Sequence, residues 1–170
     1  MHGIEEIIPI LNNKVNNKIL SLYLVGTIKS IYKKTLKDIA IKHNTTERLF
    51  FKDRLPYTQM QKEMLNYDIG IAINKPLNIT YETGGTAANK IYEYPASGIP
   101  SILLDNEHYR KYFEQYEWAF FTDLSENSLL ECIQKIDNNY HVLTQKAKED
   151  FKSNFNFETV FNSTIDSFFK

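Results

Sequence analysis

The sequence predicts an α/β fold in which helices cover both faces of a parallel β-sheet. Short apolar runs that fit buried strands alternate along the chain with stretches whose apolar residues recur at helical spacing. The runs at 69–73 and 101–104 are apolar on both faces, which is typical of parallel strands covered by helices on each side. No low-complexity linker or internal repeat interrupts the alternation. We therefore expect one domain over residues 1–170, built on a doubly wound sheet with right-handed crossovers.

Five elements are expected in the first 66 residues. They are a helix over 4–11, a buried strand over 21–25 that ends at Gly26, an amphipathic helix over 28–43, a short strand over 49–51 and a helix over 59–66. The longest of these helices carries its lysines on the outward face. Thr58 precedes the last helix, where its hydroxyl oxygen is placed to accept hydrogen bonds from the free amides of the first turn.

The second half of the chain continues the same alternation. Its expected elements are a strand at 69–73, a long polar loop over 74–85, a helix from about 86 to 97, strands at 101–104 and 118–121, and helices over 129–136, 142–151 and 157–169. Gly98 is expected to end the central helix in the left-handed conformation that glycine adopts without strain.

Composition excludes several classes of function. The 20 basic and 21 acidic residues nearly cancel, so charge gives no reason to expect nucleic acid as a partner. No apolar run approaches the roughly 20 residues that cross a bilayer, and the N-terminus lacks the pattern of a signal peptide. The four histidines show no ligand spacing, so no metal site is expected. Cys132 lies on a helical apolar face, which favours a place in the core and a reducing compartment.

The loop before the central helix is the first candidate for a binding site. Gly84 and Gly85 let the backbone approach a ligand closely, and Thr86 and Ala87 lead into a helix whose first amides are free to bind a phosphate group. An ordinary flexible loop is the alternative. The length of the segment 74–85 favours a functional loop, because loops this long are uncommon between a strand and a helix of a compact domain.

Three charged residues near this edge of the sheet are further candidates. Glu93 can accept two hydrogen bonds from a diol such as a ribose, and Lys90 can act as the counter-charge of a phosphate. Alternatively the two form a surface ion pair at i,i+3 spacing. Arg54 follows the strand at 49–51 at its carboxyl end, where ligands of such sheets bind, although basic residues at strand tips also occur without a role.

Motifs of other chemistries are absent from the sequence. There is no nucleophile elbow around Ser97, no Gly-x-Gly-x-x-Gly, no Walker sequence and no Asp-x-Asp pair. A diphosphate ligand would therefore depend on backbone amides and basic side chains in place of a protein-held cation. No catalytic residue can be named from the sequence.

The segment 89–100, Asn-Lys-Ile-Tyr-Glu-Tyr-Pro-Ala-Ser-Gly-Ile-Pro, resembles a segment of GT-B glycosyltransferases of the glycosyltransferase 4-like, or group 1, family. The resemblance extends to the strand ending in Gly26, to the stretches 50–57 and 67–71, and to the tail around 151–157, so it covers nearly the whole chain. It implies the C-terminal, Rossmann-like, donor-binding half of a GT-B fold.

This resemblance also implies an activity. Such enzymes are retaining, metal-independent transferases that use a nucleotide-sugar as donor substrate and need no cofactor. By resemblance, Glu93 would hold the donor ribose, Gly84, Gly85, Thr86 and Ala87 the diphosphate and sugar, and the stretch 52–55 with Arg54 would lie near the base. The acceptor would be a glycan or a lipid-linked molecule of surface polysaccharide synthesis, reached in the cytoplasm or peripherally at the inner membrane face.

The chain departs from the family pattern at several positions. Gly85 stands where many members carry a second glutamate, His2 stands where they carry a phosphate-contacting lysine, and Pro95 removes an amide from the helix. The acceptor domain and the first strand of the donor domain should precede Met1, so we expect either local repacking of the sheet or completion by another chain. The alternatives are a non-catalytic GT-B domain that binds through a partner chain, and a GT-B-shaped sugar-nucleotide epimerase.

Overall fold

The protein folds as an α/β body with two parallel sheets, seen in a computed structural model that describes residues 3–73, 75 and 88–168. In one sheet β3 (Leu22–Val25) pairs with β4 (Leu49–Lys52); in the other, β6 (Ser101–Leu104) lies between β5 (Gly70–Ala72) and β7 (Ala119–Thr122). All five strands expected from the sequence are present. The expected α/β class with parallel strands and flanking helices is confirmed.

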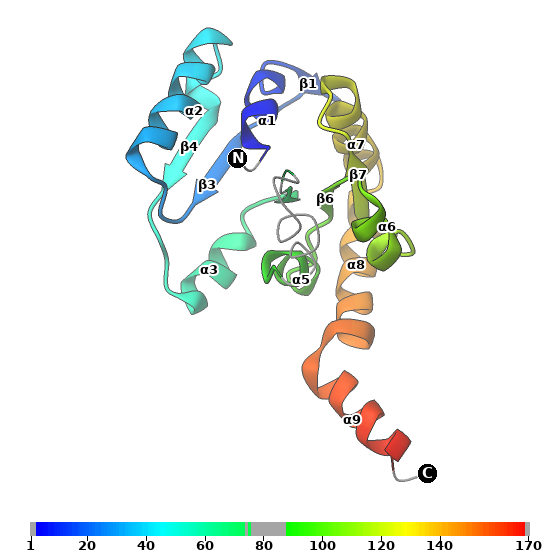
Figure 1. The fold of residues 1–170 in the computed structure, drawn as a ribbon. Coiled ribbons are helices and arrows are strands. Elements are labelled where there is room, and N and C mark those ends of the chain that lie inside the picture. The colour runs from blue at the N-terminus through cyan, green and yellow to red at the C-terminus, as the bar shows by residue number, and fades with distance from the viewer. Residues whose placement is uncertain (1–2, 74, 76–87, 169–170) are drawn as a thin grey trace.

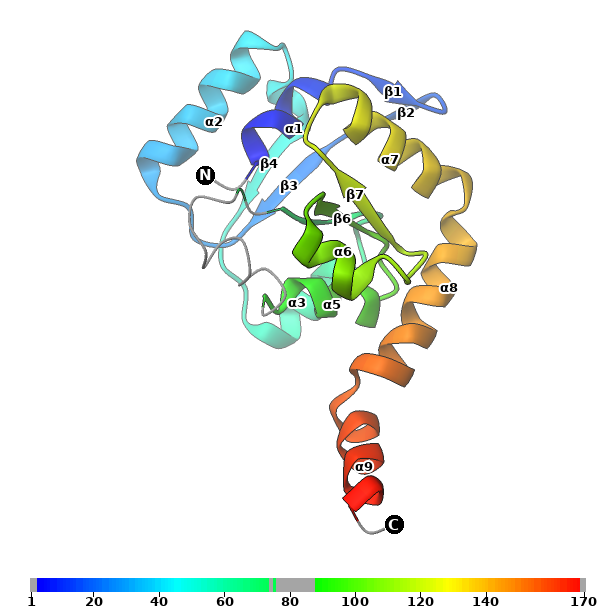
Figure 2. The ribbon, with the colours of Figure 1, turned by 45° about the vertical axis from the view of Figure 1, so that its right-hand side comes forward.

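The described helices match most of the expected ones. They are α1 (Ile4–Ile10), α2 (Ser30–Lys42), α3 (Tyr57–Met64), α5 (Lys90–Ala96), α6 (Glu107–Phe113), α7 (Glu126–Asn138), α8 (Tyr140–Asp150) and α9 (Phe157–Phe168), with a short 3-10 turn at Thr46–Arg48 and a π turn at Phe151–Phe155. In Figures 1 and 2, α1 lies between α2 and α7, and α9 projects away from the body at the end of α8.

The single sheet expected from the sequence is divided. Within the described residues, β3 has β4 as its only hydrogen-bonded neighbour and β5 has only β6. Helix α1 bridges the two sheets, because it contacts α2 beside the first and α7 beside the second. Its residues Ile7, Ile8 and Ile10 are at most 5% exposed and belong to one continuous core.

Two element boundaries differ from the prediction. Helix α3 begins at Tyr57, and Thr58 lies inside its first turn, so its hydroxyl does not cap the helix as predicted. The carbonyl of Pro56 accepts the first amides instead. Helix α5 begins at Lys90 and not near residue 86, so Glu93 lies in its first turn.

Two elements were not predicted. A hairpin of β1 (Lys14–Val15) and β2 (Lys18–Ile19) turns at Asn16 and Asn17, which both have positive φ, the geometry that two-residue hairpin loops require. Helix α6 begins after Asn106, whose side chain accepts from the amide of Tyr109 at 2.7 Å. Asparagine is a common residue in both roles, so the sequence did contain a local signal for each.

Helix α5 is held tightly against the second sheet. Ile91 is fully buried, and the ring of Tyr94 lies against the backbone of Gly70 in β5. A Cβ atom at Gly70 would lie 2.3 Å from Cδ2 of that ring, so only glycine fits there. Gly98 ends the helix with φ of 73°, as predicted. The position of α5 on the sheet is therefore fixed by packing on both sides of Glu93.

Candidate functional site

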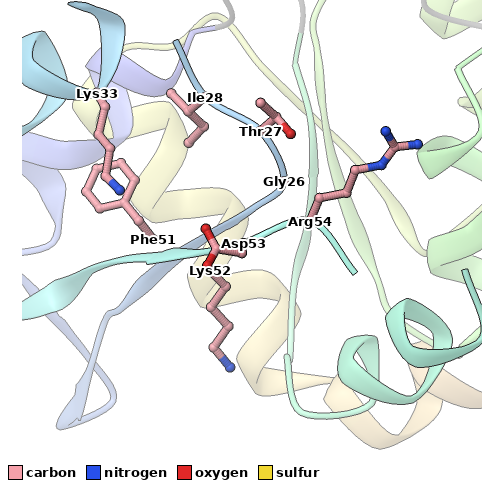
Figure 3. Close-up of a pocket in the computed structure, with 8 residues that line it drawn as sticks. All are labelled: Gly26, Thr27, Ile28, Lys33, Phe51, Lys52, Asp53 and Arg54. Carbon is pink, nitrogen blue, oxygen red and sulfur yellow. The ribbon is translucent and has the colours of Figure 1, made fainter. Parts of the chain in front are cut away.

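A pocket opens where β3 and β4 end (Figure 3). Parallel strands place their carboxyl ends at one edge, and the amide of Gly26 donates to the carbonyl of Lys52 at 3.0 Å, which holds the two ends together. The cavity has a volume of about 150 Å³ and is lined by Gly26, Thr27, Ile28, Lys33, Phe51, Lys52, Asp53 and Arg54. Small-molecule sites usually enclose about 300–1,000 Å³, so this pocket has room for one ring-sized part of a ligand.

Two cations line the pocket without a carboxylate partner. The ammonium of Lys33, from α2, lies 4.9 Å from the centre of the Phe51 ring, and Arg54 extends away from that ring on the other side of the pocket (Figure 3). Neither Lys33 nor Arg54 is in an ion pair among the residues that the structure describes. The pocket therefore presents a ring face, the two cations and the carboxylate of Asp53.

The third basic residue of the lining, Lys52, forms an ion pair outside the pocket. Its ammonium binds the carboxylate of Glu63 in α3, which also accepts from the hydroxyl of Tyr67. The hydrogen bond to Glu63 raises the pKa of Lys52, and the same bond lowers the pKa of Glu63. Figure 3 shows the Lys52 side chain directed away from Lys33 and Arg54. Lys52 thus shapes the rim of the pocket and is not available as a third free cation.

Helix α5 carries two half-buried charged side chains that form no ion pair with any residue that the structure describes. The alternative reading of Lys90 and Glu93 as a surface ion pair is wrong, because no ion pair joins them and neither side chain has a hydrogen-bond partner among the described residues. Burial lowers the pKa of Lys90 and raises the pKa of Glu93. Both shifts mean that the protein alone disfavours the charged forms, which a ligand with complementary groups would favour.

The remaining predicted contacts cannot be placed. Gly84, Gly85, Thr86 and Ala87 lie outside the described residues, and so does His2. Of the predicted site residues, the structure therefore locates Arg54 at the pocket of the first sheet and Lys90 and Glu93 on the helix that follows β5.

Sequence reasoning missed two residues near this edge. Lys33 was counted among the outward lysines of α2, and its position over Phe51 depends on how α2 lies on β4. Lys75, three residues after the end of β5, forms an ion pair with Glu6 of α1. These two residues are 69 positions apart in the sequence, so no local pattern signals the pair.

Other chemistries find no support in the described part of the chain. No group of three His, Cys, Asp or Glu residues there could hold a metal ion. Among the same residues, no helix has both the length and the apolar character needed to span a bilayer. Cys132 is buried as predicted; its thiol lies 3.3 Å from the carbonyl oxygen of Phe121, and burial raises its pKa to about 11.

Comparison with known proteins adds a structural likeness. No protein family matches the sequence, and no curated protein sequence matches it either. Among solved structures, the chain is similar to WaaG, a glycosyltransferase involved in lipopolysaccharide biosynthesis, with a TM-score of 0.69 and 14% identity. The likeness covers 95% of this chain and 42% of WaaG. At this identity it shows the fold, which resembles half of a GT-B glycosyltransferase.

Proposed function

We propose that the chain is the nucleotide-sugar-binding domain of a glycosyltransferase that transfers a sugar to a glycan or lipid-linked acceptor in surface polysaccharide synthesis. The observation that carries the proposal is the pair of half-buried charges on α5, Lys90 and Glu93, which have no ion-pair partner among the described residues. They lie in the segment whose sequence resembles the donor-binding segment of GT-B enzymes. The fold shared with WaaG supports the same assignment.

Each group has a part of the donor that suits it. The Glu93 carboxylate would accept hydrogen bonds from the ribose hydroxyls, and the Lys90 ammonium would face the diphosphate. A hydrogen bond to a charged group contributes about 1.5–3 kcal/mol, which is a sizeable share of a micromolar affinity. Gly84, Gly85, Thr86 and Ala87 would complete the diphosphate and sugar contacts.

The pocket at the ends of β3 and β4 suits the base. Its volume of about 150 Å³ fits a single ring system, and the Phe51 ring and the Lys33 and Arg54 cations offer stacking and hydrogen-bond donors. Lys33 and Arg54, which form no ion pair among the described residues, outnumber the single carboxylate of the described lining, Asp53, and so favour a ligand of negative charge. A nucleoside diphosphate combines a ring with negative charge, which a neutral sugar alone does not.

In this proposal catalysis rests on positioning and electrostatics. The domain would hold the donor so that its anomeric carbon faces the acceptor, and it would stabilise the diphosphate as it leaves. Retention of configuration and independence from metal ions are part of the proposal. The chain spans 42% of WaaG, so the acceptor would be bound by further polypeptide, and the reaction would take place in the cytoplasm or at the inner membrane face.

A non-catalytic binding module is the second candidate. Such a module would bind the nucleotide-sugar through the same residues and act through a partner chain. Both candidates require donor binding, and they differ in whether a partner restores sugar transfer.

A thermal-shift screen tests the shared requirement. UDP-, GDP-, ADP- and CMP-sugars are added to the wild type, to Glu93→Gln and to Glu107→Gln, a control at an exposed glutamate in the first turn of α6. We expect one donor to raise the Tm of the wild type and of Glu107→Gln, and to have little effect on Glu93→Gln. A folded wild type that responds to none of the donors would refute the proposal.

A further inference from the structure

Asp53 is the one carboxylate among the described residues that line the pocket at the ends of β3 and β4. Its side chain is exposed, and no hydrogen bond or ion pair joins it to another residue that the structure describes. Both carboxylate oxygens are therefore available, within the described structure, to accept hydrogen bonds from a ligand. The proposed function gives this residue no role so far.

The position of Asp53 is set by the residue before it. The carbonyl of Lys52 accepts a hydrogen bond from the amide of Gly26 at 3.0 Å, which ties the end of β4 to the end of β3. The Lys52 ammonium binds the carboxylate of Glu63 and lies 5.2 Å from the centre of the Tyr23 ring. Because both the main chain and the side chain of Lys52 are anchored, Asp53 extends from a fixed point at the edge of the pocket.

The end of β3 leaves room for a flat ring beside this carboxylate. Gly26 has a φ of 131°, and a Cβ atom built on it would have no neighbouring atom within 4 Å. Its backbone therefore borders open space, which a base can approach closely. In the view of Figure 3 the Asp53 carboxylate lies between the side chains of Phe51 and Arg54. A base in the pocket would thus have its hydrogen-bonding edge within reach of Asp53.

A carboxylate distinguishes the four common bases by their donors. Guanine carries two neighbouring donors on one edge, the N1–H and the 2-amino group, and these match the two oxygens of a carboxylate. Uracil has a single N–H between two carbonyls. Adenine and cytosine each have an amino group beside a ring nitrogen that accepts, and this nitrogen would face the carboxylate. Guanine is therefore the base that can engage both oxygens of Asp53 without setting an acceptor against them.

The two cations of the pocket suit the rest of the guanine ring. The O6 and N7 atoms of guanine are acceptors, and arginine and lysine are the side chains that most often bind them. Lys33 and Arg54 line the same cavity as Asp53 and form no ion pair among the described residues. The lining therefore offers both the acceptors and the donors that guanine requires.

We propose that Asp53 selects guanine, so that the nucleotide-sugar of this domain is a GDP-sugar. The Asp53 carboxylate accepts hydrogen bonds from N1–H and from the 2-amino group, and Arg54 or Lys33 donates to O6 and N7. A good two-point contact to a base favours it over a wrong base by about 5- to 150-fold in affinity. This inference rests on the proposed function, because it names the donor of the same site.

Calorimetric titration of the chain of residues 1–170 with free nucleoside diphosphates tests the proposal. The ligands are GDP, UDP, ADP, CDP and inosine diphosphate, which differs from GDP only by the loss of the 2-amino group. We expect GDP to bind the wild type most tightly, and inosine diphosphate to bind at least about fivefold more weakly. Because inosine keeps N1–H, O6 and N7, this comparison isolates one of the two hydrogen bonds to Asp53.

The variant Asp53→Asn should exchange one preference for another. Its amide group replaces one acceptor by a donor, which opposes the 2-amino group of guanine and suits the carbonyl that xanthine carries at that position. Asp53→Asn should therefore bind GDP more weakly than the wild type does, and bind xanthosine diphosphate more tightly. A loss of folding could not produce this gain. Asp38→Asn, at an exposed aspartate of α2 that forms no ion pair in the described structure, should keep the wild-type preference.

Three results would overturn the selection of guanine and leave the proposed function standing. They are tightest binding of UDP, ADP or CDP, equal affinity for GDP and inosine diphosphate, and an unchanged ratio of GDP to xanthosine diphosphate affinity in Asp53→Asn. A folded wild type that binds none of the diphosphates would refute both the selection of guanine and the proposed function. The two proposals therefore fail in different ways.

Discussion

Replacing Lys90 by methionine should stabilise the protein without ligand and weaken its response to the donor. The Lys90 ammonium is half-buried, burial lowers its pKa, and no described residue pairs with it. Methionine keeps the unbranched aliphatic stem and removes the charge. The two effects therefore have opposite signs, which a loss of folding could not produce.

The magnitudes follow from the burial. Leaving a charged or polar group buried without a partner costs about 1–3 kcal/mol, and about half of this applies to a half-buried group. For a domain of this size, each kcal/mol moves the Tm by about 2–4 °C, so Lys90→Met should gain about 1–6 °C. Loss of a charge-assisted contact of about 1.5–3 kcal/mol should weaken donor binding by about 10- to 150-fold.

The assay is thermal unfolding at neutral pH and low salt, with and without the best donor from the nucleotide-sugar screen. Lys34→Met is the matched control, because Lys34 is an exposed lysine of α2 that forms no ion pair in the described structure. It should leave both the free energy of unfolding and the free energy of donor binding within about 0.5 kcal/mol of the wild-type values. A Lys90→Met variant that is less stable than Lys34→Met, or that keeps the full donor response, would show the reasoning to be wrong.

Three further predictions concern single residues. Burial raises the pKa of Glu93 above 4.5, so the folded state holds the proton of this carboxyl more tightly than the unfolded state does. The wild type should therefore lose stability relative to Glu93→Gln as the pH rises from below 4.5. Urea titrations measure this difference, and parallel stability curves of the two proteins would contradict the prediction. Gly70→Ala should cost at least about 1–3 kcal/mol in denaturant unfolding, because its Cβ meets the Tyr94 ring, and the cost should shrink in a Tyr94→Ala background; equal costs would refute the clash. With a pKa of about 11, the Cys132 thiol is about 0.1% ionised at pH 8 and buried, so its labelling by a thiol reagent should follow global unfolding; rapid labelling of the native protein would show an exposed cysteine.

The strands were predictable because each satisfies a local rule. The run at 69–73 and the run at 101–104 are apolar on both faces, and each is too short for a typical helix. The end of α5 at Gly98 was predictable for the same reason, since a left-handed cap strongly favours glycine.

Features that join distant residues were not predictable. The pair of Glu6 and Lys75 and the placement of Lys33 over Phe51 depend on how α1 and α2 lie on the sheets, which the sequence does not specify locally. The sequence also did not predict that Lys90 and Glu93 form no ion pair with each other, because i,i+3 spacing permits an ion pair but does not require one. The division of the sheet was not predictable either, because strand pairing joins residues that are distant in the sequence.

The divided sheet distributes the proposed donor site over two sheets. The base pocket is lined by residues at the ends of β3 and β4 and by Lys33 of α2. Glu93 and Lys90 lie on α5, which packs against β5, β6 and α8. No backbone ladder fixes the spacing between them in the described chain, and α1 is the element that touches both sides. The span available to a nucleotide is therefore set by side-chain packing, through α1 and the one core that both sheets share.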